Sequence, residues 1–237
     1  MKTKKFCIIG CGYFGYNLAL NLHSAGAEVI AIDKREDIIE KLSERLTHVV
    51  AMDTTDKKAL QKLGLNDMDA VIVAIGEGFE DSLLTTAILQ ELGVKKIYNR
   101  VVSDIHERLL KLMGITDLLV PESEASEHLA SRLMITNLLE LFKITENYGI
   151  FEIKAPTFAV NKSLIELNLR QKYKLNLVTI IRNETSKNIL KSEISKVKKA
   201  MGVPEPDVII DKDDILVLSG FNKDFHKFNK LFDDNVD

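Results

Sequence analysis

The first half of the chain alternates short apolar runs with amphipathic segments at a regular spacing. The apolar runs are continuous, and they predict six buried strands, at residues 6–9, 29–33, 48–52, 70–75, 95–101 and 117–120. Helical periodicity predicts helices between them, at residues 17–25, 36–46, 57–63, 81–92 and 104–113. Continuous apolar strands that alternate with helices are typical of a parallel sheet covered on both faces. The pattern therefore predicts an α/β fold with a doubly wound parallel sheet.

The pattern changes in the second half. Apolar residues at helical spacing predict a long helix over residues 125–142, either a core-packing helix or a connecting helix that forms dimers. Residues 149–156 alternate with period two, which is typical of an exposed or edge strand. The remaining predicted elements are a helix at 163–173, strands at 175–181, 207–210 and 214–220, and a helix at 223–232. We expect the lysine-rich residues 186–199 to be a solvated excursion rather than a basic binding patch.

These elements predict three parts. Residues 1–124 form the doubly wound domain, residues 125–147 form the connecting helix, and residues 148–237 form a small α+β domain. The net charge of −3 gives no electrostatic case for binding nucleic acid. Neither Cys7 nor Cys11 belongs to a zinc-ligand set, so free thiols in a reducing compartment are expected. Cys11 is interpreted as a small residue that fits its loop, with a lowered thiol pKa near a helix start as the alternative.

Six residues directly after the first predicted strand form the run Gly10-Cys11-Gly12-Tyr13-Phe14-Gly15. The first glycine of such a run allows a tight turn, the second lets backbone approach a pyrophosphate, and the third lets the helix pack on the strand. Amides at the helix start then bind the anion. Asp33 closes the next strand and can accept hydrogen bonds from ribose hydroxyls. This order predicts an adenine-nucleotide site, and the alternative is a glycine turn without a ligand.

Glycines and charged residues stand at the carboxyl ends of the predicted strands. Ligands of open parallel sheets bind outside these ends, where the strand order reverses. The residues expected to converge there on one crevice are Gly10, Asp33, Asp53, Gly76, Arg100 and Glu122.

Catalytic patterns are missing from the sequence. A dehydrogenase needs a group that moves a proton while the cofactor moves hydride. Only His106 and His128 can lie near the crevice, and neither belongs to a recognisable catalytic arrangement. Two hypotheses stand at this point. The first is a regulatory module in which nucleotide binding moves one domain against another, and the second is a small NAD-dependent oxidoreductase.

Several segments together resemble a known family. They are residues 8–15, 31–33, 53–56 and 70–76, then Arg100, Pro121 and Glu122, and finally residues 164–170 and 213–220. In this order they resemble the cytosolic potassium-transport regulators of the TrkA/KtrA type, which are built from an RCK (KTN) nucleotide domain and a TrkA-C domain. The resemblance covers nearly the whole chain and favours the regulatory hypothesis.

The resemblance implies a non-enzymatic gating subunit in the cytoplasm, held at the inner face of the cell membrane by an integral membrane potassium-transport subunit. It implies homodimers and allows an octameric ring. Similar proteins bind ATP, ADP or NAD(H) in the crevice. The implied nucleotide-binding residues are Gly10, Cys11, Gly12, Tyr13, Phe14, Gly15, Asp33, Lys34, Asp53, Thr54, Ala74, Ile75, Gly76 and Arg100.

Individual roles follow from the same resemblance. Asp33 is expected to hold the ribose, Asp53 and Thr54 to lie by the adenine, and Arg100 to face the phosphates. Glu122 is expected to help hold a divalent or monovalent cation near them.

Two features concern ligand choice. Relatives often carry arginine at the position of Tyr13, and a tyrosine offers a terminal phosphate only one neutral donor, so discrimination between ATP and ADP is in question. The C-terminal domain of some relatives binds cyclic di-AMP between two subunits. The corresponding residues here are Ile165, Asn176 and Ile181. Packing in the core explains the two isoleucines equally well.

Overall fold

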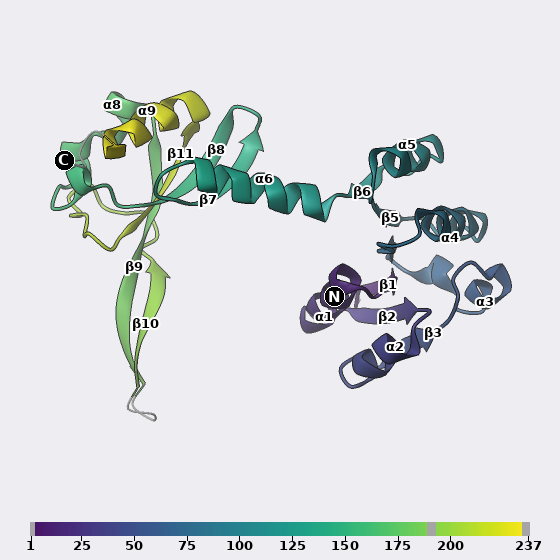
Figure 1. Ribbon diagram of the computed structural model, residues 1–237. Coiled ribbons are helices and arrows are strands. Elements are labelled where there is room, and N and C mark those ends of the chain that lie inside the picture. Colours follow the sequence, from purple (N-terminus) through teal and green to yellow (C-terminus); the bar gives the residue numbers. More distant parts are fainter. Residues whose placement is uncertain (1–2, 189–192, 234–237) are drawn as a thin grey trace. The chain divides into compact units, whose positions relative to one another are not determined.

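The chain divides into two compact units. The computed structural model describes residues 3–188 and 193–233, and the units are Met1–Glu122 and Ser123–Asp237 (Figure 1). Across the residues so described, we find no helix with the length and apolar character needed to cross a membrane.

The first unit is a six-stranded parallel sheet with the order β3-β2-β1-β4-β5-β6. Its strands are β1 (Lys5–Ile9), β2 (Glu28–Asp33), β3 (His48–Ala51), β4 (Ala70–Val73), β5 (Ile97–Arg100) and β6 (Asp117–Leu119). The intervening helices are α1 (Tyr13–Ser24), α2 (Glu36–Ser43), α3 (Lys57–Gln61), η1 (Leu65–Asp67), α4 (Phe79–Glu91) and α5 (Asp104–Leu112). The predicted doubly wound parallel sheet is confirmed.

Helices cover the sheet on both faces. Successive residues of β1 point to opposite faces, so Cys7 and Ile9 lie in one core and Ile8 in another. The first core includes residues of α3, α4 and α5, and the second includes residues of α1 and α2. Strand order runs outward from β1 in one direction and from β4 in the other. The reversal therefore places the carboxyl ends of β1 and β4 beside the glycine loop.

The second unit is built on a five-stranded antiparallel sheet with the order β10-β9-β11-β8-β7. The strands are β7 (Leu138–Thr145), β8 (Tyr148–Lys154), β9 (Asn176–Asn188), β10 (Glu193–Ala200) and β11 (Ile215–Phe221). The helices are α6 (Pro121–Met134), which begins at the end of the first unit, η2 (Thr157–Ala159), α7 (Leu164–Leu167), α8 (Leu169–Tyr173) and α9 (Asn222–Asp233). The prediction of a small α+β second domain is confirmed.

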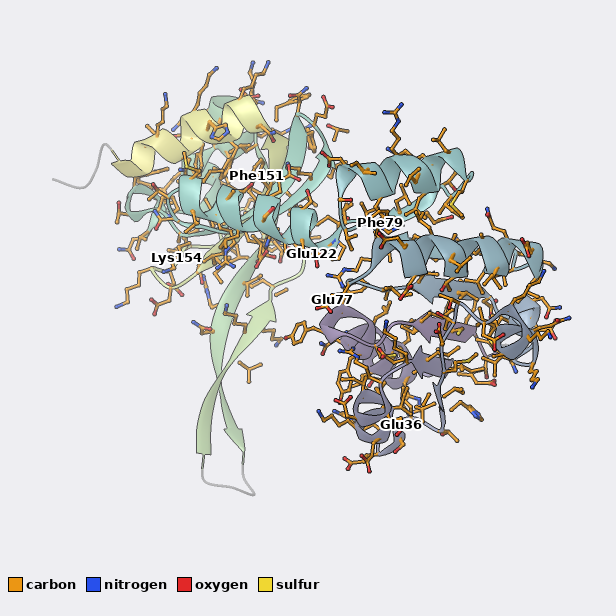
Figure 2. All side chains as sticks on the ribbon, turned by 45° about the vertical axis from the view of Figure 1, so that its right-hand side comes forward. Glu36, Glu77, Phe79, Glu122, Phe151 and Lys154 are labelled. Carbon is orange, nitrogen blue, oxygen red and sulfur yellow. The ribbon has the colours of Figure 1, made fainter. Side chains whose placement is uncertain are left out.

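Aromatic stacking and one ion pair stabilise this second unit. Phe151 of β8 (Figure 2) stacks on Phe225 of α9, with ring centroids 3.7 Å apart and planes inclined by 5°. Asp214 is buried, and Arg182 of β9 donates to both of its carboxylate oxygens, at 2.7 and 2.6 Å. A buried carboxylate is stable in such a place because it is paired.

The predicted helix over 125–142 is wrong in its second half. Helix α6 ends at Met134, and Asn137 adopts a left-handed conformation with φ 61°. Leu138 then begins β7, which pairs antiparallel with β8. Strand β8 therefore lies between β7 and β11 and is no edge strand, contrary to the prediction. Apolar residues at spacings of three and four fit a helix, but pairing with β8 favours the strand.

Two further predictions for this unit need correction, and the lysine-rich stretch can be placed in part. The helix at 163–173 is interrupted by Asn168, whose φ of 45° separates α7 from α8. The described part of the lysine-rich stretch belongs to the ribbon of β9 and β10 (Figure 1), and residues 189–192 lie outside the described residues. The predicted strand at 207–210 contributes only an isolated bridge between Ser163 and Ile209.

Candidate nucleotide-binding site

The loop between β1 and α1 requires glycine at two positions. Gly10 has φ +87°, and a Cβ on it would lie 2.8 Å from the amide nitrogen of Ile75. A Cβ on Gly15 would lie 2.0 Å from the carbonyl oxygen of Gly10, so the first turn of α1 packs directly on the loop. The amides of that first turn have no acceptor within the helix. The loop is thus a close-packed turn that ends at the positive end of a helix.

A pocket of about 410 Å³ lies at the carboxyl edge of the sheet. This volume is within the range of small-molecule sites. The predicted site residues that line it are Gly10, Gly12, Tyr13, Asp33, Lys34, Asp53, Thr54, Ala74, Ile75, Gly76 and Arg100. They stand at the carboxyl ends of five different strands, β1 to β5, and the fold brings them to one place because parallel strands share their carboxyl edge. Their binding roles stay predictions.

The other predicted site residues stand behind the lining or beside it. Cys11 is buried, and Phe14 lies beneath the guanidinium of Arg100, whose Cζ is 5.8 Å from the ring centroid. Gly15 supports the loop from the first turn of α1. Glu122 accepts a hydrogen bond from Nη2 of Arg100.

The carboxylate of Asp33 is buried yet ionised. Burial alone would raise its pKa, but hydrogen bonds from the side chain and amide of Arg35 and from the amide of Cys11 outweigh this effect and lower the pKa below its ordinary value. The Cys11 amide lies 2.7 Å from Oδ2 of Asp33, so the same carboxylate also fixes the glycine loop.

The thiol of Cys11 is inert. Burial raises its pKa to about 12, assisted by the charge of Asp33, and Sγ lies 3.5 Å from the carbonyl oxygen of Ile32. The alternative of a lowered thiol pKa is therefore wrong, because desolvation outweighs the helix end. Cys7 is also buried, and desolvation raises its pKa as well.

Three cationic side chains line the pocket among the described residues, and each is paired with a carboxylate of the same chain. Lys34 lies 3.3 Å from Asp81, Arg35 lies 3.1 Å from Asp33, and Arg100 pairs with Glu122. Sequence reasoning missed Arg35, Asp81 and Glu77, which also line the pocket. The position of Arg35 two residues after Asp33 was the available signal, since a side chain at that spacing in a turn can reach back to the carboxylate.

Asp53 and Thr54 follow β3 and differ in exposure. Asp53 is exposed, and the hydroxyl and amide of Thr55 donate to its Oδ1 at 2.7 and 2.9 Å, which lowers its pKa. Thr54 is buried, with its hydroxyl 2.9 Å from that of Thr85 on α4. A nucleotide base in this part of the pocket would meet the Asp53 carboxylate, while the Thr54 hydroxyl serves packing between β3 and α4.

Known relatives cover nearly the whole length of the chain. A family model described as the TrkA-N domain matches residues 6–121. The Ktr system potassium uptake protein C of Bacillus subtilis (strain 168) is 34% identical over 227 residues, which are 96% of both chains. The Ktr system potassium uptake protein A of the same organism is 32% identical over 228 residues, again 96% of both. The chain belongs to the Ktr potassium uptake protein family.

Solved structures share the fold at lower identity. The GsuK RCK domain superposes with a TM-score of 0.63 and 19% identity, over 98% of this chain and 48% of that chain. The GsuK channel superposes with a TM-score of 0.64 and 20% identity, over 98% of this chain and 40% of that chain. The likeness covers both units, so these solved structures share the predicted pairing of a Rossmann-like domain with a small second domain.

The residues expected to contact cyclic di-AMP lie in the second unit. Ile165 is exposed on α7, Asn176 is exposed at the start of β9, and Ile181 is half-buried further along that strand. The pocket described in this unit is lined by other residues: Val160, Asn161, Arg182, Asn183, Asp211, Lys212, Asp213 and Asp214. In the described parts of the chain, we find no cluster of three or more His, Cys, Asp or Glu side chains suited to a metal. The cation role of Glu122 stays a prediction.

Proposed function

We propose that this chain is a regulatory subunit of a potassium uptake system and that it binds an adenine nucleotide in the pocket of its first unit. One observation carries the proposal: glycines, Asp33 and Arg100 line a single pocket at the strand-order reversal, in a chain of the Ktr family. The chemistry of the lining supports an anion with a ribose. The loop and α1 offer amides, Arg100 offers a guanidinium, and Asp33 offers an acceptor.

The proposed ligand is ATP or ADP, with NAD(H) as a further member of the same class. A channel of the same fold, GsuK, has been solved bound to NAD. A divalent or monovalent cation held by Glu122 would lower the repulsion between the nucleotide phosphates and the carboxylates at the pocket. Cyclic di-AMP at Ile165, Asn176 and Ile181 is proposed as a separate signal to the second unit.

The proposed partner is an integral membrane potassium-transport subunit, with the chain at its cytoplasmic side as a homodimer or an octameric ring of dimers. Ligand binding controls such an assembly only if the nucleotide has different affinities for two arrangements of the subunits. Light scattering of the purified chain tests the assembly, and a monomer at working concentration would contradict it.

Titration calorimetry with ATP, ADP and NADH tests the nucleotide site. We expect at least one of these ligands to bind, and Asp33→Asn to weaken its binding, because Asp33 also holds the glycine loop through the Cys11 amide and a neutral amide accepts more weakly than a carboxylate. Asp37→Asn is the matched control, since it removes the same charge from the exposed first turn of α2. Equal affinities for both variants would refute a role of Asp33 in the nucleotide site.

Two activity measurements separate the proposal from the oxidoreductase alternative. Steady consumption of NADH with a small carbonyl compound would favour the enzyme. Nucleotide-dependent potassium flux in vesicles that contain the membrane subunit, with and without the chain, would favour the regulator. If flux is the same with and without the chain, the regulatory proposal is wrong.

A further inference from the structure

Every acceptor position on Asp33 is already used by the chain itself. Oδ2 accepts from the amide of Cys11 at 2.7 Å and from Nη2 of Arg35 at 3.3 Å. Oδ1 accepts from the amide of Arg35 at 2.9 Å and from its Nε at 3.1 Å. A carboxylate offers about four lone-pair positions. The hydroxyls of a ribose would find none of them free.

The four donors differ in how easily they can leave. The Cys11 amide belongs to the glycine loop, and the Arg35 amide belongs to the turn between β2 and α2, so both are fixed by the fold. The guanidinium of Arg35 is carried on a long side chain that is 50% exposed, whereas the Asp33 side chain is 6% exposed. Arg35 also lines the pocket. Its two side-chain hydrogen bonds are therefore the ones that a ligand can replace.

We propose that Arg35 is a specificity-determining residue whose guanidinium occupies the place of the ribose hydroxyls. This inference rests on the proposed nucleotide site. A nucleotide gains its ribose hydrogen bonds to Asp33 only by displacing Arg35, so two charge-assisted bonds are lost as others form. The ribose 2′-hydroxyl consequently adds little net affinity in the wild-type protein. Removing the guanidinium frees two acceptor positions of Asp33 for the ribose hydroxyls.

Calorimetry with ADP and 2′-deoxy-ADP measures the contribution of the ribose 2′-hydroxyl as the ratio of the two affinities. The variant is Arg35→Met, which keeps much of the stem and removes the donors. The control is Lys34→Met, which removes one positive charge from the same rim, where Lys34 pairs with Asp81 rather than with Asp33. Any general loss of attraction for phosphate affects both variants and both ligands, so it cancels in the ratio.

In the wild type and in Lys34→Met we expect ADP and 2′-deoxy-ADP to bind within about threefold of each other. In Arg35→Met we expect ADP to be favoured about tenfold, because one hydroxyl now donates to an acceptor position of the carboxylate that the guanidinium has left. Arg35→Lys, which keeps the charge but loses the forked geometry, should fall between them. If Arg35→Met does not fold, Arg35→Lys takes its place in the test.

Three outcomes overturn the inference in different ways. If ADP binds but the ratio is the same in the wild type and the Arg35 variants, Arg35 does not control ribose recognition, and the nucleotide site itself stands. If neither the wild type nor any variant binds ADP, ATP or NADH, the proposed function fails and the inference fails with it. A ratio that falls in Arg35→Met would mean that Arg35 holds Asp33 in place for the ribose instead of competing for it.

Discussion

Replacing Gly12 and Gly15 by alanine separates the two roles of the glycine loop. A methyl on Gly15 would lie 2.0 Å from the backbone oxygen of Gly10, and ordinary contact begins at 3.4 Å. The backbone must therefore move by about 1.4 Å, and no rotamer change can relieve the clash. A methyl on Gly12 meets nothing within 4 Å, and φ −62° with ψ −171° suits alanine.

The expected costs follow from these contacts. Gly15→Ala overpacks a backbone contact and should lower the free energy of unfolding by about 3 kcal/mol, or about 10 °C in Tm. For Gly12→Ala, the lower entropy of the unfolded chain offsets the poorer helix cap, and the net change should stay within about 1 kcal/mol. Gly12, however, lines the pocket, and nothing lies within 4 Å of an added methyl group. The substitution should weaken ADP binding by roughly tenfold, because the pyrophosphate can no longer approach the backbone.

Differential scanning calorimetry without ligand, followed by titration with ADP, measures both effects on the same samples. We expect low Tm for Gly15→Ala and near-normal Tm with poor binding for Gly12→Ala. The packing argument is refuted if Gly15→Ala melts within 2 °C of the wild type, a difference of about 1 kcal/mol or less. The pocket argument is refuted if Gly12→Ala binds ADP as the wild type does.

Three further substitutions test other parts of the molecule. Tyr13 lines the pocket and is 92% exposed, so Tyr13→Arg should tighten ATP binding about tenfold through a charge-assisted bond, and an equal gain for adenosine would contradict this. His106 is buried, with Nε2 unpartnered, and burial lowers its pKa; the unfolded chain therefore binds the proton first, and stability should fall as pH drops below about 6.5. Between pH 7.5 and 5.5, calorimetry should show a smaller loss of Tm for His106→Phe than for the wild type, and an equal loss in both would contradict this expectation. Arg182→Met leaves the buried carboxylate of Asp214 without its cation and should cost about 3–5 kcal/mol in urea unfolding, partly recovered by adding Asp214→Asn. No recovery in the double variant would mean that the pair is not the source of the loss.

The first unit was predictable because its signals are local. Strands covered on both faces must be apolar at every position, so the apolar run from Ala70 to Val73 is recognisable as a strand from the sequence. The convergence of Asp33 and Arg100 then follows from topology, since residues at the ends of parallel strands share one edge whatever lies between them. Distance along the chain is irrelevant to such a site.

The second unit was less predictable because its pairings are not local. Leu138 and Leu141 have the spacing of a helix, and only contact with Ile153 and Phe151 of β8 makes them a strand. The left-handed Asn137 follows the end of the helix, but asparagine is common enough inside helices that its presence alone is a weak signal. The contact between Arg35 and Asp33 was missed for a different reason: the spacing was visible, while the direction of a long side chain is set by the surrounding fold.

The pairing of pocket cations with carboxylates of the chain bears on the choice between enzyme and regulator. An anionic ligand does not meet free charges here, because Lys34, Arg35 and Arg100 each have a partner in the unliganded chain. Binding is then an exchange of partners, and the net gain is smaller than the new contacts alone would suggest. Such an exchange does not favour the tight binding of a redox cofactor. Such an exchange suits a sensor, because its ligand has to leave when the ligand concentration falls. Binding of the proposed nucleotide would also release carboxylates such as that of Glu122 at the start of α6, and the bound and free states would then differ at that helix.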